Sequence, residues 1–525
     1  MRHFFFLLFC FALTNVYAQP TQITIGSPDN EENYPMIRLS NGDYVLAGCT
    51  QNVGLGGKDV LVTRTTSTGN IIWTRQFGGA GDETAISVSQ TADGGFVIGG
   101  ETFSNDANGN AFIFKVDASG TMQWWKEYGN NLYDITYSVC ALADGNIISA
   151  GLMEVAPVDY DAFLMKTDAN GDTLWTKVIG VPGIDHAVNV IPTSDSGYIF
   201  CGKTLSHGAG ICDCWLVKTD ANGDTLWTRT YGGIGWDESM DIIEQPNGYI
   251  VCGGTNSEHA SNYDFLLMQV DFSGNLVWVK QYGGINVEDS YCVQEVPGEG
   301  YVLAGYTETY SYNNSRGTDS SNAFLLKTNY TGDTVWTMVY GGTLKEECFS
   351  VAVVPNAGYA IAGYTASFGD SLQTYMFLTD SLGFTSCLER RVQPDIWVPT
   401  FAQGSYSYNV RSGYPVTAPT MQQMNAGMNR TVNCTAPLSS ATITSTTDFS
   451  VFPNPTNGTI SVQSAKPMKV VRLYDVNGNA TDCQFTVAGS ANELHVTVPR
   501  AAGVYSVEIT FEDGSTGTKT IIVSD

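Results

Sequence analysis

The sequence predicts an all-β protein, and three observations lead to that prediction. A tryptophan recurs six times at nearly even spacing, Gly-containing turns separate short apolar runs, and only 15% of the residues are charged. Aromatic residues make up 12% of the chain, which contains 56 glycines. This balance favours pleated, half-buried strands joined by tight turns over helices.

The tryptophans mark a repeat of about 50 residues. Each one lies four residues after a glycine, and the spacings are 51, 51, 52, 51 and 58. The six are Trp73, Trp124, Trp175, Trp227, Trp278 and Trp336. The period at 82–129 resolves into four strand-like segments, at 85–90, 96–102, 111–116 and 122–128. Four short strands per period of this length are typical of a propeller blade.

The last repeat predicts how the ring closes. It has strand-like segments at 358–363 and 375–379 but lacks a tryptophan strand after Asp380. At the other end of the chain, residues 21–25 precede the first full repeat in register with the missing piece. A blade cannot bury both of its faces alone, so the ring must close. We therefore expect a seven-bladed β-propeller at 19–387, with the N-terminal strand completing the last blade.

The first 18 residues have the pattern of a signal peptide. Arg2 and His3 precede a ten-residue apolar run, and Val16-Tyr17-Ala18 is a small-residue cleavage site. No later stretch approaches the roughly 20 apolar residues that a spanning helix requires, so no transmembrane segment is expected. Export would place the remaining eleven cysteines in an oxidising compartment.

Two cysteine patterns matter for the domain organisation. Cys387 and Cys434 bracket a segment rich in Pro, Gly and Asn, and we expect a disulfide between them that pins an irregular extension at 388–434. Cys212 and Cys214 are interpreted as a thiol pair or local disulfide in preference to half of a metal site. A Ser/Thr-rich linker is expected at 435–447, followed by a small β-sandwich at 448–525.

Four motifs in that last segment occur in a fixed order. They are Phe-Pro-Asn-Pro-x-x-Gly, Leu-Tyr-Asp-x-x-Gly, Gly-x-Tyr-x-Val and a final Lys-x-Ile-Ile-Val. The residues that carry them are Pro453, Asn454, Pro455, Gly458, Tyr474, Asp475, Gly478, Gly503, Tyr505 and Lys519. The segment resembles the type A C-terminal sorting domain of the type IX secretion system of Bacteroidota. The resemblance implies contact with that machinery, passage across the outer membrane, and release or attachment at the cell surface.

The repeats at about 20–388 resemble the Gly-rich propeller repeats of secreted bacterial proteins, which bears on fold more than on function. The formal net charge of −27 argues against nucleic acid or an anionic membrane as partner, because both require a basic face. We expect a monomer.

One acidic residue per period precedes the first strand of each repeat. The seven are Glu31, Asp82, Asp134, Asp185, Asp237, Glu288 and Glu346. Two interpretations are open. The carboxylates could form a ring near the axis that holds a cation such as Ca²⁺. Alternatively each could cap the backbone N–H groups of its own turn, and a feature repeated in every blade favours this second interpretation.

An insertion at 308–321 explains the one long period. It is rich in Tyr, Asn and Ser, and Tyr310, Tyr312 and Arg316 are candidates for contacting a glycan or a protein, against the alternative of a variable surface loop. The chain contains no His-Glu-x-x-His motif and no Gly-x-Ser-x-Gly elbow. The sequence therefore favours a non-enzymatic binding or adhesion module. The alternative is a polysaccharide-active hydrolase or lyase that uses carboxylates on one propeller face.

Overall fold

The computed structural model describes residues 21–51, 56–257, 262–311, 320–385, 388–411, 416–417, 421–425 and 428–435, and in the tail 449–452, 459–464, 468–474, 480–481, 484–487, 493–497, 503–511 and 516–523. These residues contain strands and no helix, so none of them forms a helix that could cross a membrane. The chain divides into two units, Met1–Ala436 and Pro437–Asp525.

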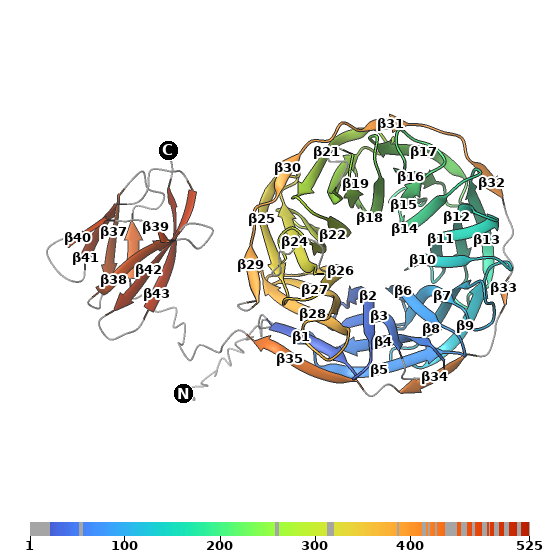
Figure 1. The fold of residues 1–525 in the computed structure, drawn as a ribbon, viewed down its shortest axis with the longest axis horizontal. Helices are drawn as coiled ribbons and strands as arrows, with labels where there is room; N and C mark the ends of the chain where they lie inside the picture. Colours follow the sequence, from blue (N-terminus) through green and yellow to red (C-terminus); the bar gives the residue numbers. More distant parts are fainter. Residues whose placement is uncertain are drawn as a thin grey trace, which may run out of the picture. The chain divides into compact units, whose positions relative to one another are not determined.

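The first unit is a ring of seven antiparallel sheets around a central channel (Figure 1). Blades 1 and 2 contain β2 (Glu31–Arg38), β3 (Tyr44–Gln51), β4 (Lys58–Thr65), β5 (Ile71–Gly78), β6 (Glu83–Gln90), β7 (Phe96–Thr102), β8 (Asn110–Val116) and β9 (Met122–Tyr128). Blades 3 and 4 contain β10 (Asp134–Ala141), β11 (Ile147–Ala156), β12 (Asp159–Thr167), β13 (Thr173–Gly180), β14 (Asp185–Pro192), β15 (Tyr198–Thr204), β16 (Asp213–Thr219) and β17 (Thr225–Gly232). Blades 5 and 6 contain β18 (Asp237–Gln245), β19 (Gly248–Thr255), β20 (Asp264–Val270), β21 (Leu276–Gly283), β22 (Glu288–Val296), β23 (Gly300–Thr307), β24 (Asn322–Thr328) and β25 (Thr334–Tyr340).

Blade 7 is built from both ends of the ring. It contains β26 (Glu346–Val354), β27 (Gly358–Thr365) and β28 (Gln373–Asp380), and its fourth strand is β1 (Thr21–Gly26). Strand β1 pairs antiparallel with β28, with Ile23 opposite Met376. The predicted seven-bladed propeller, closed by residues 21–25, is confirmed.

The segment after blade 7 differs from the irregular extension that the sequence predicts. It forms seven short strands, which we call the belt: β29 (Glu389–Arg391), β30 (Asp395–Trp397), β31 (Ala402–Gly404), β32 (Asn409–Arg411), β33 (Val416–Thr417), β34 (Gln422–Asn425) and β35 (Asn429–Thr435). Each adds a fifth, outermost strand to one blade, in the order 6, 5, 4, 3, 2, 1, 7. The belt thus runs around the rim in the opposite direction to the blades and ends on β1 (Figure 1).

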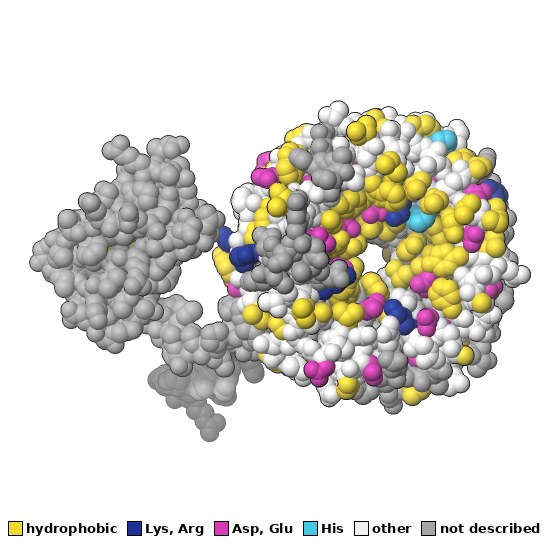
Figure 2. All heavy atoms as spheres, in the orientation of Figure 1, with side chains coloured by type: hydrophobic (Ala, Val, Ile, Leu, Met, Phe, Trp, Pro, Cys, Tyr) yellow, Lys and Arg dark blue, Asp and Glu magenta, His cyan; other side chains and the backbone are white. Residues whose placement is uncertain are grey.

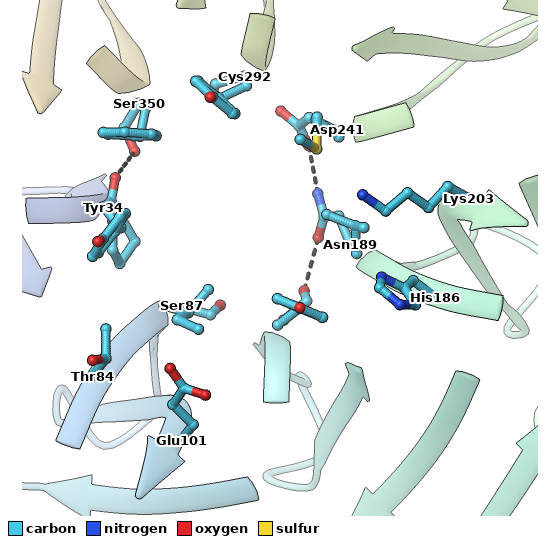
Figure 3. A pocket seen from close by; sticks show the side chains of 18 residues that line it. Tyr34, Thr84, Ser87, Glu101, His186, Asn189, Lys203, Asp241, Cys292 and Ser350 are labelled. Atoms are coloured by element: carbon cyan, nitrogen blue, oxygen red, sulfur yellow. Dashed lines mark hydrogen bonds between the residues drawn. The ribbon is translucent and has the colours of Figure 1, made fainter. Parts of the chain in front are cut away.

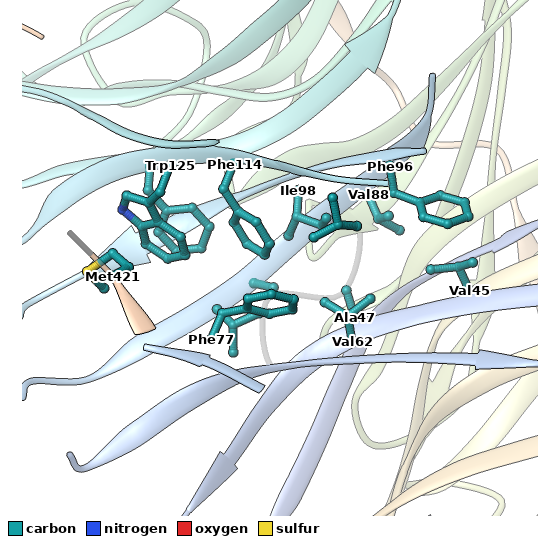
Figure 4. Packing of buried hydrophobic residues seen from close by; sticks show 14 of the residues in the cluster. Val45, Ala47, Val62, Phe77, Val88, Phe96, Ile98, Phe114, Trp125 and Met421 are labelled. Carbon is teal, nitrogen blue, oxygen red and sulfur yellow. The ribbon is translucent and has the colours of Figure 1, made fainter. Parts of the chain in front are cut away.

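The core consists of apolar layers between neighbouring blades. Between blades 1 and 2, Phe77 packs against Phe114 with ring centroids 4.8 Å apart, and Ala47 leaves room for the larger side chains opposite (Figure 4). Met421 of the belt covers the outer end of this layer. Cys201 and Cys252 are fully buried at the positions equivalent to Ala47, as small core residues.

The repeated tryptophan and glycine form a lock between neighbouring blades. The Trp124 indole N–H donates to the carbonyl of Ala169 in blade 3, at 3.1 Å. Its ring lies so close to Gly171 that a Cβ there would come within 2.8 Å of it, and Gly171 has a φ of +77°, which favours glycine. The Tyr128 hydroxyl donates to the Gly171 carbonyl at 2.8 Å. The regular spacing of Trp and Gly in the sequence therefore reflects contacts between neighbouring blades.

The second unit contains two four-stranded sheets. One has the order β36 (Phe449–Phe452), β37 (Thr459–Ser464), β41 (Glu493–Thr497), β40 (Gln484–Val487). The other has the order β39 (Ala480–Thr481), β38 (Met468–Tyr474), β42 (Gly503–Phe511), β43 (Thr516–Val523). Val462 of the first sheet and Val507 of the second are fully buried, as expected for the inner faces of a sandwich.

Candidate functional site at the channel mouth

The seven acidic residues predicted to form a ring lie at or beside the start of the innermost strands. Six are fully buried: Glu31, Asp134, Asp185, Asp237, Glu288 and Glu346. In blade 2 the equivalent position belongs to Glu83, which is also buried, whereas Asp82 is exposed and accepts a hydrogen bond from the Lys58 N–H at 2.8 Å.

The buried carboxylates cap their own loops. Glu288 accepts hydrogen bonds from the Gly284 N–H at 2.7 Å, the Thr307 hydroxyl at 2.6 Å and the Thr309 N–H at 3.0 Å. The pattern of a carboxylate accepting from the N–H four residues earlier recurs in all seven blades. Burial raises the pKa of Glu288 from 4.5 to about 7. Across the described residues, no group of three or more His, Cys, Asp or Glu side chains could hold a metal ion. This geometry favours the capping interpretation.

The insertion after β23 has its first tyrosine tied into the ring. The Tyr310 hydroxyl donates to the carbonyls of Gly283 and Gln393, at 3.1 and 3.2 Å, and its ring packs against the core near Phe324. Tyr310 therefore anchors the belt to blades 5 and 6. Tyr312 and Arg316 lie outside the described residues.

The predicted disulfide also falls outside what the structure describes, because Cys387 and the side chain of Cys434 are not described. Cys212 and Cys214 are free, buried thiols. The backbones of Tyr474, Gly503, Tyr505 and Lys519 lie in tail strands β38, β42, β42 and β43. Pro453, Asn454, Pro455, Gly458, Asp475 and Gly478 lie outside the described residues, as do residues 1–20 with the predicted signal peptide.

A β-bulge in every innermost strand shapes the channel. The pairing register shifts three or four residues after the capping carboxylate, for example between Thr136 and Ser138. A bulge re-aims the extra side chain, here toward the axis. The re-aimed residues are Tyr34, Ile86, Tyr137, Val188, Met240, Tyr291 and Phe349, and all line a cavity of 540 Å³. Hydrophobic side chains surround much of this hollow, with acidic, basic and histidine side chains among them (Figure 2).

In six of the seven innermost strands, the next residue hydrogen-bonds to the following blade, and in blade 1 that residue is Pro35. The Ser138 hydroxyl donates to Asn189 at 2.8 Å, and the Asn189 amide donates to Asp241 at 2.5 Å (Figure 3). Asp241 also accepts from the Val293 N–H at 2.8 Å. At the closing junction, Ser350 accepts from the Met36 N–H at 2.9 Å. The same kind of bond therefore joins β26 of blade 7 to β2 of blade 1, beside the closure that β1 makes with β28.

One cross-strand pair per blade lies beside each capping carboxylate, and no two pairs are alike. They are Glu32–Cys49, Thr84–Glu101, Ile135–Leu152, His186–Lys203, Glu238–Gly254, Asp289–Tyr306 and Glu347–Tyr364. The repeat is thus uniform at the capping position and variable one residue later. A comparison of that second position across the repeats would have found this variation in the sequence.

Charged members of these pairs are held by specific partners. Lys203 donates to Glu238 at 2.6 Å, and the Tyr133 hydroxyl donates to Glu101 at 2.6 Å. Burial raises the pKa of Glu101. Burial, and then the charge of Lys203, lower the pKa of His186 to about 3, so that its imidazole is neutral at physiological pH. Glu101 and Lys203 approach the opening from different blades (Figure 3).

A recess of 280 Å³ opens beside the channel at blades 3 and 4. It shares Tyr137, His186 and Lys203 with the channel. Its remaining walls are Tyr133, Leu152, Tyr160, Ile184, Leu205 and Trp236. The Lys203 ammonium lies 5.6 Å from the centre of the Trp236 ring, a cation–π contact. The residue equivalent to Leu152 is not a leucine in any of the other six blades. The recess therefore departs from the sevenfold repeat of the ring.

The C-terminal unit matches a known protein family. Residues 450–524 match the family described as "Secretion system C-terminal sorting domain", so the chain carries the sorting tail of a type IX secretion cargo. This tail supports export, followed by secretion or attachment at the cell surface.

The chain has two more distant similarities. Over 134 residues the chain is 25% identical to "Regulatory protein FlaEY" of Caulobacter vibrioides, an alignment that covers 22% of this chain and only 14% of that protein. A solved structure described as "YCF48 bound to D1 peptide" matches 70% of this chain and 97% of its own, at 12% identity and a TM-score of 0.36. A similarity this low says nothing of the ligand.

Proposed function

We propose that this protein is a binding β-propeller, exported through its sorting tail, that takes a ligand at the channel mouth without transforming it. The observation that carries the proposal is the recess beside the channel. There, aromatic side chains, a cation and a cavity meet beside the channel, where the blades differ from one another. Ligand sites are typically concave and mostly apolar, with few polar groups.

The walls of the recess indicate what kind of group it accepts. Four aromatic residues and three aliphatic ones line it, so the ligand must bring an apolar or aromatic group. Lys203 is already paired with Glu238, and His186 is neutral. The site therefore offers little net charge, and shape with aromatic contact would dominate recognition.

A polysaccharide-active enzyme is the second candidate, and Glu101 is the residue that favours it. This carboxyl lines the channel, is hydrogen-bonded to Tyr133, and has a raised pKa, as a general acid requires. The other carboxylate that lines the channel, Asp241, belongs to blade 5 and is already engaged by the Asn189 amide and the Val293 N–H. The binding proposal needs no such second carboxylate.

Binding and turnover can be tested on the same protein. We expect the full chain to bind at least one ligand that carries an apolar or aromatic group on an array of surface glycans and peptides, and Trp236→Ala to abolish the signal from that ligand. Leu174→Gln, on the opposite face, is the control and should bind normally. Release of shortened glycans by the wild type, lost in Glu101→Gln, would instead establish the enzyme.

Delivery has a separate test. Removal of residues 447–525 should leave the ring in the periplasm, because the sorting tail is what the type IX machinery engages. Cell fractionation with antibodies to the ring measures the distribution. Normal surface delivery of the truncated chain would contradict the assignment of the tail.

A further inference from the structure

A second pocket lies at the junction of blades 4 and 5, on the face opposite the channel mouth. It has a volume of 400 Å³ and is lined by turns and strand ends that lie at that face. Its position follows from the topology, because the turn after β14, the start of β17 and the turn after β20 all meet there. It shares no residue with the channel or the recess.

The floor of this pocket is apolar and held rigidly. Leu226 is 60% exposed and Phe272 is 45% exposed, although both are large apolar side chains. Trp227 also lines the pocket and donates from its indole N–H to the Phe272 carbonyl at 3.2 Å. The Phe272 ring meets Tyr249 edge to face, with centroids 5.5 Å apart. Exposed aromatic side chains fixed in this way form a preorganised platform.

The rim of the pocket is polar, and its charges are fixed. Lys218, whose side chain is only 4% exposed, pairs with Asp195 at 2.8 Å. Glu244 accepts from the Ser194 N–H at 2.8 Å and from the Ser194 hydroxyl at 2.6 Å. Two carboxylates against one ammonium give the rim a net negative charge, which disfavours anionic ligands. Carboxylates are acceptors and the ammonium is a donor, so the rim can bond hydroxyl groups in both senses.

From this combination we propose that the junction pocket binds a neutral saccharide. A pyranose ring presents a C–H face, which suits the Leu226–Trp227–Phe272 platform, and an edge of hydroxyls, which suits Asp195, Lys218 and Glu244. The volume lies in the range of small-molecule sites. The proposal does not depend on the function proposed for the channel mouth.

The neighbouring junctions lack the same combination. Between blades 3 and 4, Ala221 stands at the position of Phe272 and Pro192 at that of Glu244. Between blades 5 and 6, Gln269 stands at the position of Lys218 and accepts from the Trp278 indole N–H at 2.7 Å, so an amide replaces the ammonium of the rim. The saccharide site is therefore expected at the one junction.

The test uses the full chain with cellobiose, maltose and N,N′-diacetylchitobiose, measured by saturation-transfer NMR and calorimetry. We expect at least one disaccharide to bind, and Leu226→Gln and Phe272→Ser each to weaken it about tenfold or more. Leu174→Gln, the same change at the junction of blades 3 and 4, and Trp236→Ala, in the recess, should leave the affinity unchanged.

Three results would overturn the proposal: no binding of any of the three disaccharides, unchanged affinity in Phe272→Ser, or a loss confined to Trp236→Ala. Thermal unfolding checks that each variant is folded, and since both substituted side chains are about half exposed, we expect little change. If one variant fails to fold, the other decides. A failure here leaves the channel-mouth proposal standing, because Trp236→Ala tests that site alone.

Discussion

Arg430 donates from its guanidinium Nε to the carbonyl oxygen of Gly69, at 2.9 Å. At internal junctions such as that between blades 4 and 5, the same bond comes from a tyrosine, as with the Tyr231 hydroxyl on the Gly274 carbonyl at 2.6 Å. Blade 7 has no tryptophan strand to supply it. The belt therefore provides, between blades 7 and 1, the contact that the repeat provides elsewhere.

Replacement of this arginine should weaken the contact between blades 7 and 1. Arg430→Met removes a charged donor from a half-buried site, and we expect a loss of about 1.5–3 kcal/mol in the free energy of unfolding. Tyr231→Phe is the matched control at the junction of blades 4 and 5, with an expected loss of about 1 kcal/mol. Urea unfolding measures both. Equal losses would mean that the junction of blades 7 and 1 has no special dependence on Arg430.

The belt as a whole should be required for a soluble ring. A chain ending after Ala436 should unfold at the same temperature as the full protein's ring. A chain ending after residue 387 exposes the outer edges of all seven blades, and open edges promote aggregation. It also loses the side-chain amides of Gln403 and Gln423. Gln403 accepts from the Leu276 N–H and donates to the Gly274 carbonyl, and Gln423 does the same with Met122 and Gly120. Gel filtration and thermal unfolding compare the two truncations, and matching profiles would contradict a role for the belt.

The buried capping carboxylates should make the ring less stable as pH rises. The pKa of Glu288 is raised from 4.5 to about 7 by burial, so the folded state holds a proton that the unfolded state has lost. Stability contributed in this way is complete below about pH 4.5 and is lost as the pH rises toward 7. Glu288→Gln should flatten this dependence, by on the order of 3 kcal/mol across the window. Urea unfolding at several pH values measures the slope, and an unchanged slope would contradict the assignment.

Calcium should have no effect on the stability of the ring. The donors that surround Glu31, Asp185, Asp237 and Glu346 are N–H and O–H groups of their own loops, which leave these oxygens already engaged. Calorimetry with added CaCl₂ or EDTA should give coincident unfolding curves. A stabilisation of several degrees by Ca²⁺ would restore the cation ring as an explanation.

The sequence predicted the ring because each blade repeats its own turns, and the missing tryptophan strand revealed the role of residues 21–25. It did not predict the belt, because strands as short as Val416–Thr417 have no periodicity to recognise. Their hydrogen-bonding partners lie up to several hundred residues away, as with Met122 and Gln423. The sequence did not predict the recess either, because Tyr133, Tyr160 and Trp236 come together only when blades 3 to 5 are side by side.

The direction of the belt has a mechanical consequence for a protein held by its C-terminal end. A pull on the chain beyond Thr435 first loads the pair Thr21–Thr435, at the free end of an antiparallel ladder. Such a ladder opens one bond at a time, so the rim would unwind blade by blade, starting at blade 7, before any blade itself is strained. In a single-molecule pulling experiment this would give a series of small, early steps ahead of the main rupture, and a single abrupt event would rule it out.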